Sequence, residues 1–185
     1  GMNLHSWKAA ERARFLAMVQ AEGKQTLLEI GAGAGRDSLF FQQNGLTVTC
    51  VDLSPAMVAH CRNQGLDAHV VEFAQLNQHF TPAQFDSIYA INCLLHVPKA
   101  ELPSILEKIH TLLHLHGLFY WGQYGGVDEE GIWEGDHYEP QRFFAHYTDE
   151  PFKALAKRYF TLETFCQIPQ RAQGDYFHAA TLRKS

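Results

Sequence analysis

The sequence has few of the features that mark membrane, secreted or nucleic-acid-binding proteins. It contains no run of about 18 apolar residues, and its N-terminus lacks the basic-then-apolar pattern of a signal peptide. Lys and Arg number 15 against 20 Asp and Glu, so the net charge is −5 with neutral His, and no basic excess is present to hold a phosphate backbone. We therefore expect a cytoplasmic protein with no membrane span and no nucleic-acid partner.

The cysteines lack the spacing of a metal site or of a disulfide framework. None of the four forms a C-x-x-C pair, so we expect buried thiols of an intracellular protein: Cys50, Cys61, Cys93 and Cys166. His110 and His114 lie one helical turn apart, like metal ligands, but a solvated helix end is the simpler interpretation and we predict no metal site. With 185 residues, of which 46% are hydrophobic, the chain is long enough to form one domain over residues 1–185 without disulfide bonds or a structural metal ion.

Strand-like apolar runs alternate with helical segments along the chain, which is typical of a parallel sheet covered by helices. We expect strands at 26–30, 47–51, 68–73, 85–91 and 118–124, and helices at 4–21 (within an N-terminal helical segment 1–23), 36–44, 55–65 and 99–114. One more helix opens at Thr148 and Asp149. Strands at about 160–168 and 176–183 follow without an intervening helix, so they should pair antiparallel. The pattern predicts an α/β fold.

Residues 125–147 interrupt this alternation. A connection this long without regular structure is usually an active-site lid or a disordered linker. Disordered linkers are poor in aromatic residues, whereas this segment contains Trp133, Tyr138, Phe143, Phe144 and Tyr147. We therefore expect an ordered active-site lid. Its many acidic residues either favour binding of a cationic or neutral substrate or form a solvated acidic loop, and the sequence leaves both interpretations open.

A glycine-rich loop follows the first expected strand. A strand, a glycine loop and a helix open a mononucleotide-binding unit, in which backbone amides approach the ligand closely. The dinucleotide fingerprint G-x-G-x-x-G requires a third glycine where this sequence has Arg36. The loop instead has an acid followed by three alternating glycines, Glu29-x-Gly31-x-Gly33-x-Gly35.

This loop resembles the first motif of the class I S-adenosylmethionine-dependent methyltransferases, an acidic residue followed by G-x-G-x-G. The stretch from Phe85 to Pro98 closely resembles the fourth motif of the family, and Asp52 ends the second strand where the family has an acid. The resemblance covers about residues 25–124. It implies a three-layer α/β/α sandwich around a Rossmann-like, seven-stranded, mostly parallel sheet of order 3-2-1-4-5-7-6, with a C-terminal antiparallel strand.

The resemblance also implies S-adenosylmethionine as cofactor and gives its contacts. Asp52 would bind both ribose hydroxyls, Leu53 and Met57 would flank the adenine, and the residues after the fourth strand would line the methionine part. An acid at position 29 can receive the cofactor's ammonium group directly or through water. Arg36 would either meet the cofactor carboxylate or lie at the surface, paired with Asp37. The implied cofactor-binding residues are Glu29, Gly31, Ala32, Gly33, Gly35, Asp52, Leu53, Met57, Glu72, Phe73, Asn92, Cys93 and Leu94.

His96 follows at the rim of this expected site and is the candidate catalytic residue. Imidazole titrates near neutral pH, so His96 can serve as a general base, although a polar contact to the backbone would explain it equally well. The candidate acceptor-binding residues come from the expected lid: Trp133, Tyr138, Arg142 and Phe143. In an alternative interpretation of the lid, Arg142, Phe143 and Phe144 cover the acceptor pocket, with the two rings as an apolar wall.

Together these features predict methyl transfer to a small-molecule acceptor by in-line displacement. The Asn/Asp-Pro-Pro-Tyr signature of enzymes that methylate nucleobase or glutamine nitrogens is absent, because Asn92 is followed by Cys-Leu-Leu. Two alternatives stay open: an NAD(P)-dependent oxidoreductase on a Rossmann-like fold, and a non-catalytic module that binds S-adenosylmethionine. The sequence leaves the accepting atom, the oligomeric state and a truncated N-terminus undecided.

Overall fold

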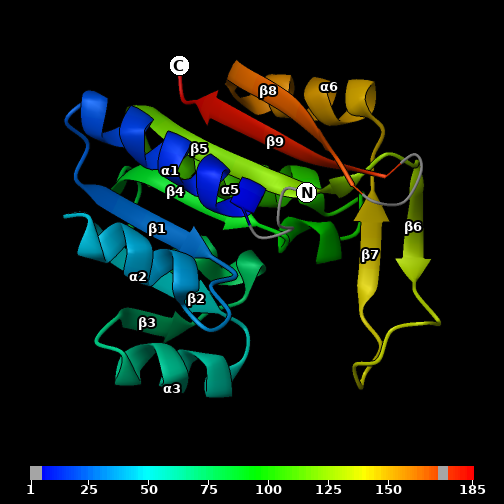
Figure 1. Ribbon diagram of the computed structural model, residues 1–185, viewed down its shortest axis with the longest axis horizontal. Helices are drawn as coiled ribbons and strands as arrows, with labels where there is room; N and C mark the ends of the chain where they lie inside the picture. Colours follow the sequence, from blue (N-terminus) through cyan, green and yellow to red (C-terminus); the bar gives the residue numbers. More distant parts are fainter. Residues whose placement is uncertain (1–5, 171–174) are drawn as a thin grey trace.

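The computed structural model describes residues 6–170 and 175–185, and its centre is a seven-stranded sheet of order β3-β2-β1-β4-β5-β9-β8 (Figure 1). Its strands are β1 (Thr26–Ile30), β2 (Thr47–Asp52), β3 (Asp67–Val70), β4 (Phe85–Ile91), β5 (Leu113–Gly125), β8 (Thr161–Pro169) and β9 (Tyr176–Arg183). Strands β1 to β5 pair in parallel, and β9 runs antiparallel to both β5 and β8. The predicted fold class and the predicted strand order are therefore confirmed.

Helices cover both faces of the sheet (Figure 1). They are α1 (Ser6–Ala21), α2 (Arg36–Gln43), α3 (Pro55–Asn63), α4 (Leu76–His79), α5 (Leu102–Leu112) and α6 (Asp149–Tyr159), with short 3-10 turns η1 (Phe73–Gln75) and η2 (Leu94–His96). Side chains alternate between faces along each strand, so Leu27 packs with α1 and α2, whereas Leu28 and Ile30 pack with α5 and α6. Among the described residues, every helix is too short or too polar to cross a bilayer.

The ends of several elements differ from the sequence-based expectation. The helix expected at 99–114 spans only Leu102–Leu112, because the chain turns extended at Leu113 and begins β5 there. The strand expected at 68–73 ends at Val70, and Phe73 begins the turn η1. Cys166 is exposed, contrary to the expectation that all four thiols are buried, because it lies on the edge strand β8.

Residues 125–147 form an ordered arm and not a segment without regular structure. Strands β6 (Glu129–Ile132) and β7 (Phe143–His146) pair antiparallel and project beside the main sheet (Figure 1). Hydrogen bonds tie the arm to the main body: Gln123 Nε2 of β5 donates to Ala145 O, His96 Nδ1 of η2 binds Phe143 O, and Lys99 N donates to the Glu130 carboxylate. Strand pairing and these hydrogen bonds explain why the segment is ordered, as predicted. Trp133 and Tyr138 nevertheless remain 56% and 62% exposed.

Candidate cofactor site and acceptor cavity

The glycine loop joins β1 to α2 at the carboxyl edge of the parallel strands. Gly31, Gly33 and Gly35 have φ values of 70°, 54° and 79°, a region that other residues rarely adopt. The loop also lies close to its neighbours: a Cβ on Gly31 would stand 2.4 Å from Cys93 Cβ, and one on Gly35 would stand 2.7 Å from Leu66 Cδ1. The backbone N–H groups of Gly31 and Ala32 both donate to Val51 O. The loop is therefore a rigid turn held against β2 and β4.

Asp52 links this loop to the end of β2. Its Oδ2 accepts a hydrogen bond from Gly33 N at 2.8 Å, and its Oδ1 accepts one from Ser54 N at 2.9 Å. Ser54 in turn caps α3, because its Oγ accepts from Met57 N. An ionised carboxylate has about four acceptor positions, so these two bonds fix its direction and leave positions for two further donors.

The other predicted nucleotide contacts surround Asp52 at the same edge of the sheet. Leu53 is 65% exposed and Met57 is 41% exposed, so both side chains present apolar surface at this edge. Glu72 is exposed at the residue before η1, and Phe73 is half-buried. These side chains lie at the carboxyl ends of β2 and β3, where ligands bind in open parallel sheets.

The end of β4 brings a third group of predicted residues to the loop. Asn92 has a φ of 51°, and its N–H donates to Gly122 O of β5 at 2.8 Å. Its Oδ1 is buried and has no hydrogen-bond partner among the described residues. Cys93 and Leu94 are buried, and Cys93 Sγ donates to Ile30 O at 3.2 Å. A buried amide oxygen without a partner carries a desolvation cost, which a bound donor removes.

Glu29 lies beneath the loop, on β1, and is 2% exposed. The Ser38 hydroxyl of α2 donates to its carboxylate. Burial raises the pKa of Glu29 well above its ordinary value, and the nearby charge of Asp37 raises it further. The structure thus places Glu29 with α2, and its predicted contact to the cofactor's ammonium group remains a prediction.

We expect Glu29→Gln to stabilise the protein at alkaline pH and to weaken cofactor binding. Because the folded pKa is raised, the wild-type protein loses stability as the pH rises through that value, and a neutral amide removes this loss. If Glu29 receives the ammonium, affinity for S-adenosylhomocysteine falls by about tenfold, the effect of one charge-assisted bond. Urea unfolding at pH 6 and pH 8 and calorimetric titration measure the two effects.

The matched variant for this test is Ser38→Ala. It removes the hydroxyl that donates to Glu29 but keeps the carboxyl group, so we expect lower stability at both pH values. Equal stability curves for the wild type and Glu29→Gln would contradict the assigned direction of the pKa shift.

A cavity of about 530 Å³ lies between the arm, the turn η2 and the end of β5. It is lined by Leu95, Tyr124, Glu129, Glu130, Gly131, Ile132, Trp133, Phe144 and His146. Leu95 directly follows Asn92–Leu94 in the chain, so the cavity and the predicted methionine site share the segment that follows β4. Its volume suits a small organic molecule.

The predicted acceptor residues lie in different places around this cavity. Trp133 lines it. Arg142 forms two hydrogen bonds to the Asp136 carboxylate, at 2.9 and 2.8 Å, and its guanidinium covers the exposed ring of Tyr138. Phe143 packs against the main core, and its neighbour Phe144 lines the cavity instead. The sequence offered both Phe143 and Phe144 as an apolar wall, and the structure places only Phe144 at the cavity. Sequence reasoning missed His146 and Tyr124 as lining residues, because the side chains that face the cavity depend on a strand pairing that the sequence pattern did not reveal.

His96 is the last residue of η2, and its ring contacts the arm. Its Nδ1 is 2.8 Å from Phe143 O, and a carbonyl oxygen only accepts, so Nδ1 carries the proton and Nε2 keeps its lone pair. Its ring meets that of Phe144 edge-on, at 4.7 Å between centroids. Burial is the main cause that lowers the pKa of His96, which keeps the imidazole neutral at pH 7.

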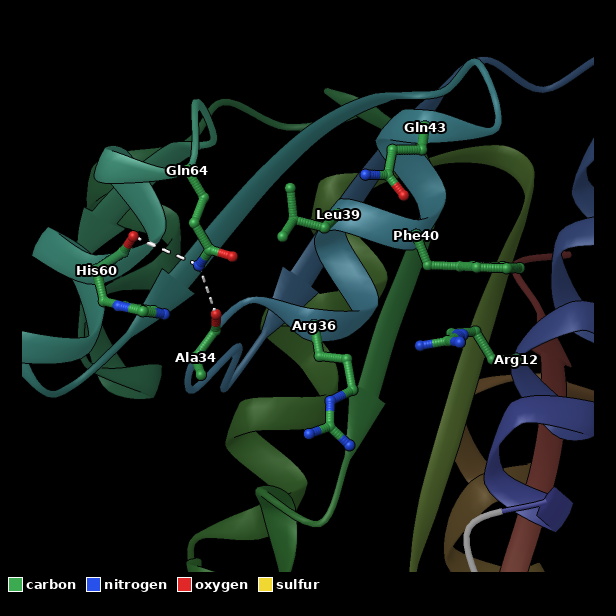
Figure 2. Close-up of a pocket in the computed structure, with 8 residues that line it drawn as sticks. All are labelled: Arg12, Ala34, Arg36, Leu39, Phe40, Gln43, His60 and Gln64. Carbon is green, nitrogen blue, oxygen red and sulfur yellow. Dashed lines mark hydrogen bonds between the residues drawn. The ribbon is translucent and has the colours of Figure 1, made fainter.

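A second hollow, of about 450 Å³, lies among α1, α2 and α3 (Figure 2). Figure 2 shows Arg36 extending from the start of α2 and Arg12 of α1 beneath the ring of Phe40. Asp37 pairs with Arg12, at 2.8 Å, so the interpretation of Arg36 as its partner is wrong. The cause is tertiary: α1 packs over the first turn of α2 and brings a long-range cation to Asp37.

Comparison with known proteins agrees with this geometry. A family model described as a methyltransferase domain matches residues 28–119, which include the glycine loop, Asp52 and the end of β4. The chain belongs to the class I S-adenosylmethionine-dependent methyltransferases. The predicted family is confirmed, and with it the cofactor class; the oxidoreductase alternative is set aside.

Individual relatives are distant. The chain is 31% identical over 94 residues to a ubiquinone biosynthesis O-methyltransferase of Pseudomonas paraeruginosa, a match that covers 48% of this chain and 40% of the relative. It is 26% identical over 95 residues to an uncharacterized methyltransferase of Synechocystis, covering 51% of this chain and 45% of the relative. The chain therefore matches less than half the length of these curated relatives.

Solved structures share the fold over nearly the whole chain. The 1,6-didemethyltoxoflavin-N1-methyltransferase of Burkholderia thailandensis, crystallised with 1,6-didemethyltoxoflavin and S-adenosylhomocysteine, has a TM-score of 0.74 at 23% identity, covering 100% of this chain and 92% of that one. The cyclase SpnF has a TM-score of 0.72 at 16% identity, covering 96% and 81%. At these identities the likeness concerns the fold alone.

Proposed function

We propose that this chain transfers the methyl group of S-adenosylmethionine to a small molecule bound in the arm cavity. The observation that carries the proposal is the lining of the cavity, which includes Leu95, the residue directly after the predicted methionine-binding residues Asn92–Leu94. The 1,6-didemethyltoxoflavin-N1-methyltransferase noted above shares this fold and was crystallised with a small molecule, 1,6-didemethyltoxoflavin, which supports this type of substrate.

The residues at the carboxyl edge fit the cofactor. Bound S-adenosylmethionine supplies a methyl group already activated by its sulfonium. Asp52 has acceptor positions left for the ribose hydroxyls, while the exposed side chains of Leu53 and Met57 offer apolar cover to the adenine. The chain's main contribution is to align an acceptor lone pair behind the methyl carbon. Orientation of this kind is worth about 7–11 kcal/mol in favourable intramolecular models.

His96 is the proposed general base for acceptors that must lose a proton. Its neutral ring, with Nδ1 fixed on Phe143 O, presents Nε2 as the proton acceptor. This role and the backbone contact are compatible, because each uses a different ring nitrogen.

A second candidate is a site that binds the cofactor without transferring its methyl group. The similarity in fold to the [4+2]-cyclase SpnF favours keeping this candidate, because the same architecture hosts another chemistry.

Calorimetric titration with S-adenosylhomocysteine, with NADH as the comparison ligand, tests the cofactor part of the proposal. We expect saturable binding of S-adenosylhomocysteine alone. The catalytic part is tested by incubating the protein with methyl-labelled S-adenosylmethionine and a small-molecule cell extract, where label should enter an extractable product. Binding without any label transfer would favour the non-catalytic candidate, and tighter binding of NADH would overturn the proposal.

A further inference from the structure

The walls of the arm cavity combine flat rings with negative charge. Trp133 and Phe144 stand nearly perpendicular, at 87° and 6.2 Å between ring centroids, and so form an apolar corner. Tyr124 adds a third ring from the end of β5. Rings arranged in this way hold a flat apolar body, and their faces also attract cations.

Strand pairing in the arm explains how this corner stays open. Gly131 of β6 is the cross-strand partner of Phe144, and a Cβ placed on Gly131 would have no atom within 4 Å. The next pair on the same face is Glu129 with His146, because side chains two residues apart on a strand share a face. A ring wall and a carboxylate–imidazole pair therefore stand side by side on one face of the arm.

The negative charge of this wall is not cancelled by its lining. Glu129 and Glu130 both line the cavity, and no Lys or Arg does so among the described residues. Two neighbouring cations are engaged elsewhere: Lys99 Nζ binds Asp128, and Arg142, which lies 5.3 Å from the centre of the Phe144 ring, binds Asp136. The Glu130 carboxylate accepts a hydrogen bond from Lys99 N at 2.9 Å, so Glu129 is the lining carboxylate that faces His146. His146 Nδ1 lies 3.8 Å from Glu129 Oε1, and burial lowers the pKa of this histidine, so it is neutral at pH 7.

We propose that the methyl acceptor is a basic amine carried on a flat aromatic body, with Trp133 and Phe144 holding the body and Glu129, beside His146, holding the amine. This inference rests on the proposed function and names its substrate class. A phenol or a carboxylate would place a neutral or negative group against the Glu129 carboxylate, which makes both poorer occupants of this cavity.

Methyl transfer to such an amine requires that its ammonium form first lose a proton. The ammonium bound at Glu129 gives one proton to the neutral imidazole of His146, and the proton passes on to water. For an amine acceptor His146 therefore takes the place of His96 as the base, because His146 lines the cavity. The lone pair of the resulting amine forms the new N–C bond while the C–S bond of the cofactor breaks. The electron pair of that bond stays on sulfur, which yields S-adenosylhomocysteine and an N-methylammonium product.

The test compares three ligands with one ring system and different end groups: tryptamine, tryptophol and indole-3-propionate. Each is titrated calorimetrically into the protein saturated with S-adenosylhomocysteine, at pH 7.5 and low salt. We expect tryptamine to bind at least about tenfold more tightly than tryptophol, the effect of one charge-assisted hydrogen bond, and indole-3-propionate to bind most weakly.

Two variants, each of which removes one negative charge, show which carboxylate causes the preference for tryptamine. Glu129→Gln removes the carboxylate that faces His146, and we expect it to abolish most of the preference for tryptamine over tryptophol. Asp128→Asn removes the neighbouring carboxylate, which binds Lys99 and does not line the cavity, and we expect it to keep the preference. Both residues are exposed, so both variants should fold.

The inference is overturned if tryptamine binds no better than tryptophol, if none of the three ligands binds, or if the preference survives Glu129→Gln. The preceding titration with S-adenosylhomocysteine reports on the proposed function separately. A protein that binds S-adenosylhomocysteine without preferring the amine loses this inference alone, whereas one that does not bind S-adenosylhomocysteine loses both.

Discussion

Replacing Asp52 with alanine should weaken the binding of S-adenosylhomocysteine by well over tenfold. If the carboxylate accepts both ribose hydroxyls, each lost charge-assisted bond costs about 1.5–3 kcal/mol. The substitution also frees the N–H groups of Gly33 and Ser54, which Asp52 holds at 2.8 and 2.9 Å, so the glycine loop loses its anchor to β2. Calorimetric titration of the wild type and the variant measures the difference.

Asp67→Asn is the matched control for this prediction. Asp67 begins β3, is exposed, and binds Thr49 and His69 away from the glycine loop. We expect it to leave the affinity within about twofold, the change of a surface substitution of about 0.5 kcal/mol or less. Unchanged affinity in Asp52→Ala would show that the cofactor does not bind at this edge as proposed.

Gly31→Ala should be far more damaging than Gly33→Ala. Both residues have positive φ, and an alanine there costs about 1 kcal/mol from backbone strain. At Gly31 the new Cβ would also stand 2.4 Å from Cys93 Cβ, whereas at Gly33 it would have no atom within 4 Å. Overpacking of this kind adds about 1–3 kcal/mol, so we expect Gly31→Ala to lower the free energy of unfolding by about 2–4 kcal/mol.

Urea unfolding of the two single variants tests this difference, and a second substitution tests its cause. Changing Cys93 to glycine removes the atom that the new Cβ would meet, so Gly31→Ala combined with Cys93→Gly should recover part of the loss in a double-mutant cycle. If Gly33→Ala destabilises as much as Gly31→Ala, backbone strain alone accounts for the effect and the steric argument fails.

Local signals in the sequence predicted the sheet well. The alternation of apolar runs with helical segments depends on neighbouring residues, so it indicated β1, β2 and β4 and the helices between them. Asp52 and the glycine loop were predictable for the same reason: a strand end, a tight turn and a helix cap are each short-range features. The family resemblance supplied the strand order, which periodicity alone does not give.

The arm was less predictable because its structure depends on long-range contacts. Phe143 and Phe144 are adjacent and chemically identical, yet the pairing of β7 with β6 turns the first into the core and the second into the cavity. Likewise, the sequence offered Arg36 as the partner of Asp37, while the folded chain brings Arg12 from α1. A shift of one residue in register exchanges the faces of a strand, and no local pattern fixed that register here.

The place of β9 in the sheet has a consequence for how the chain is made. The last strand in the sequence, Tyr176–Arg183, lies between β5 and β8 and not at an edge. During synthesis, β3, β2, β1, β4 and β5 can assemble while β5 still has an open edge, and β8 has no adjacent strand until β9 emerges. Exposed edges of this kind invite pairing with other chains. The nascent protein is therefore most prone to aggregate in the interval between the synthesis of residue 125 and that of residue 183.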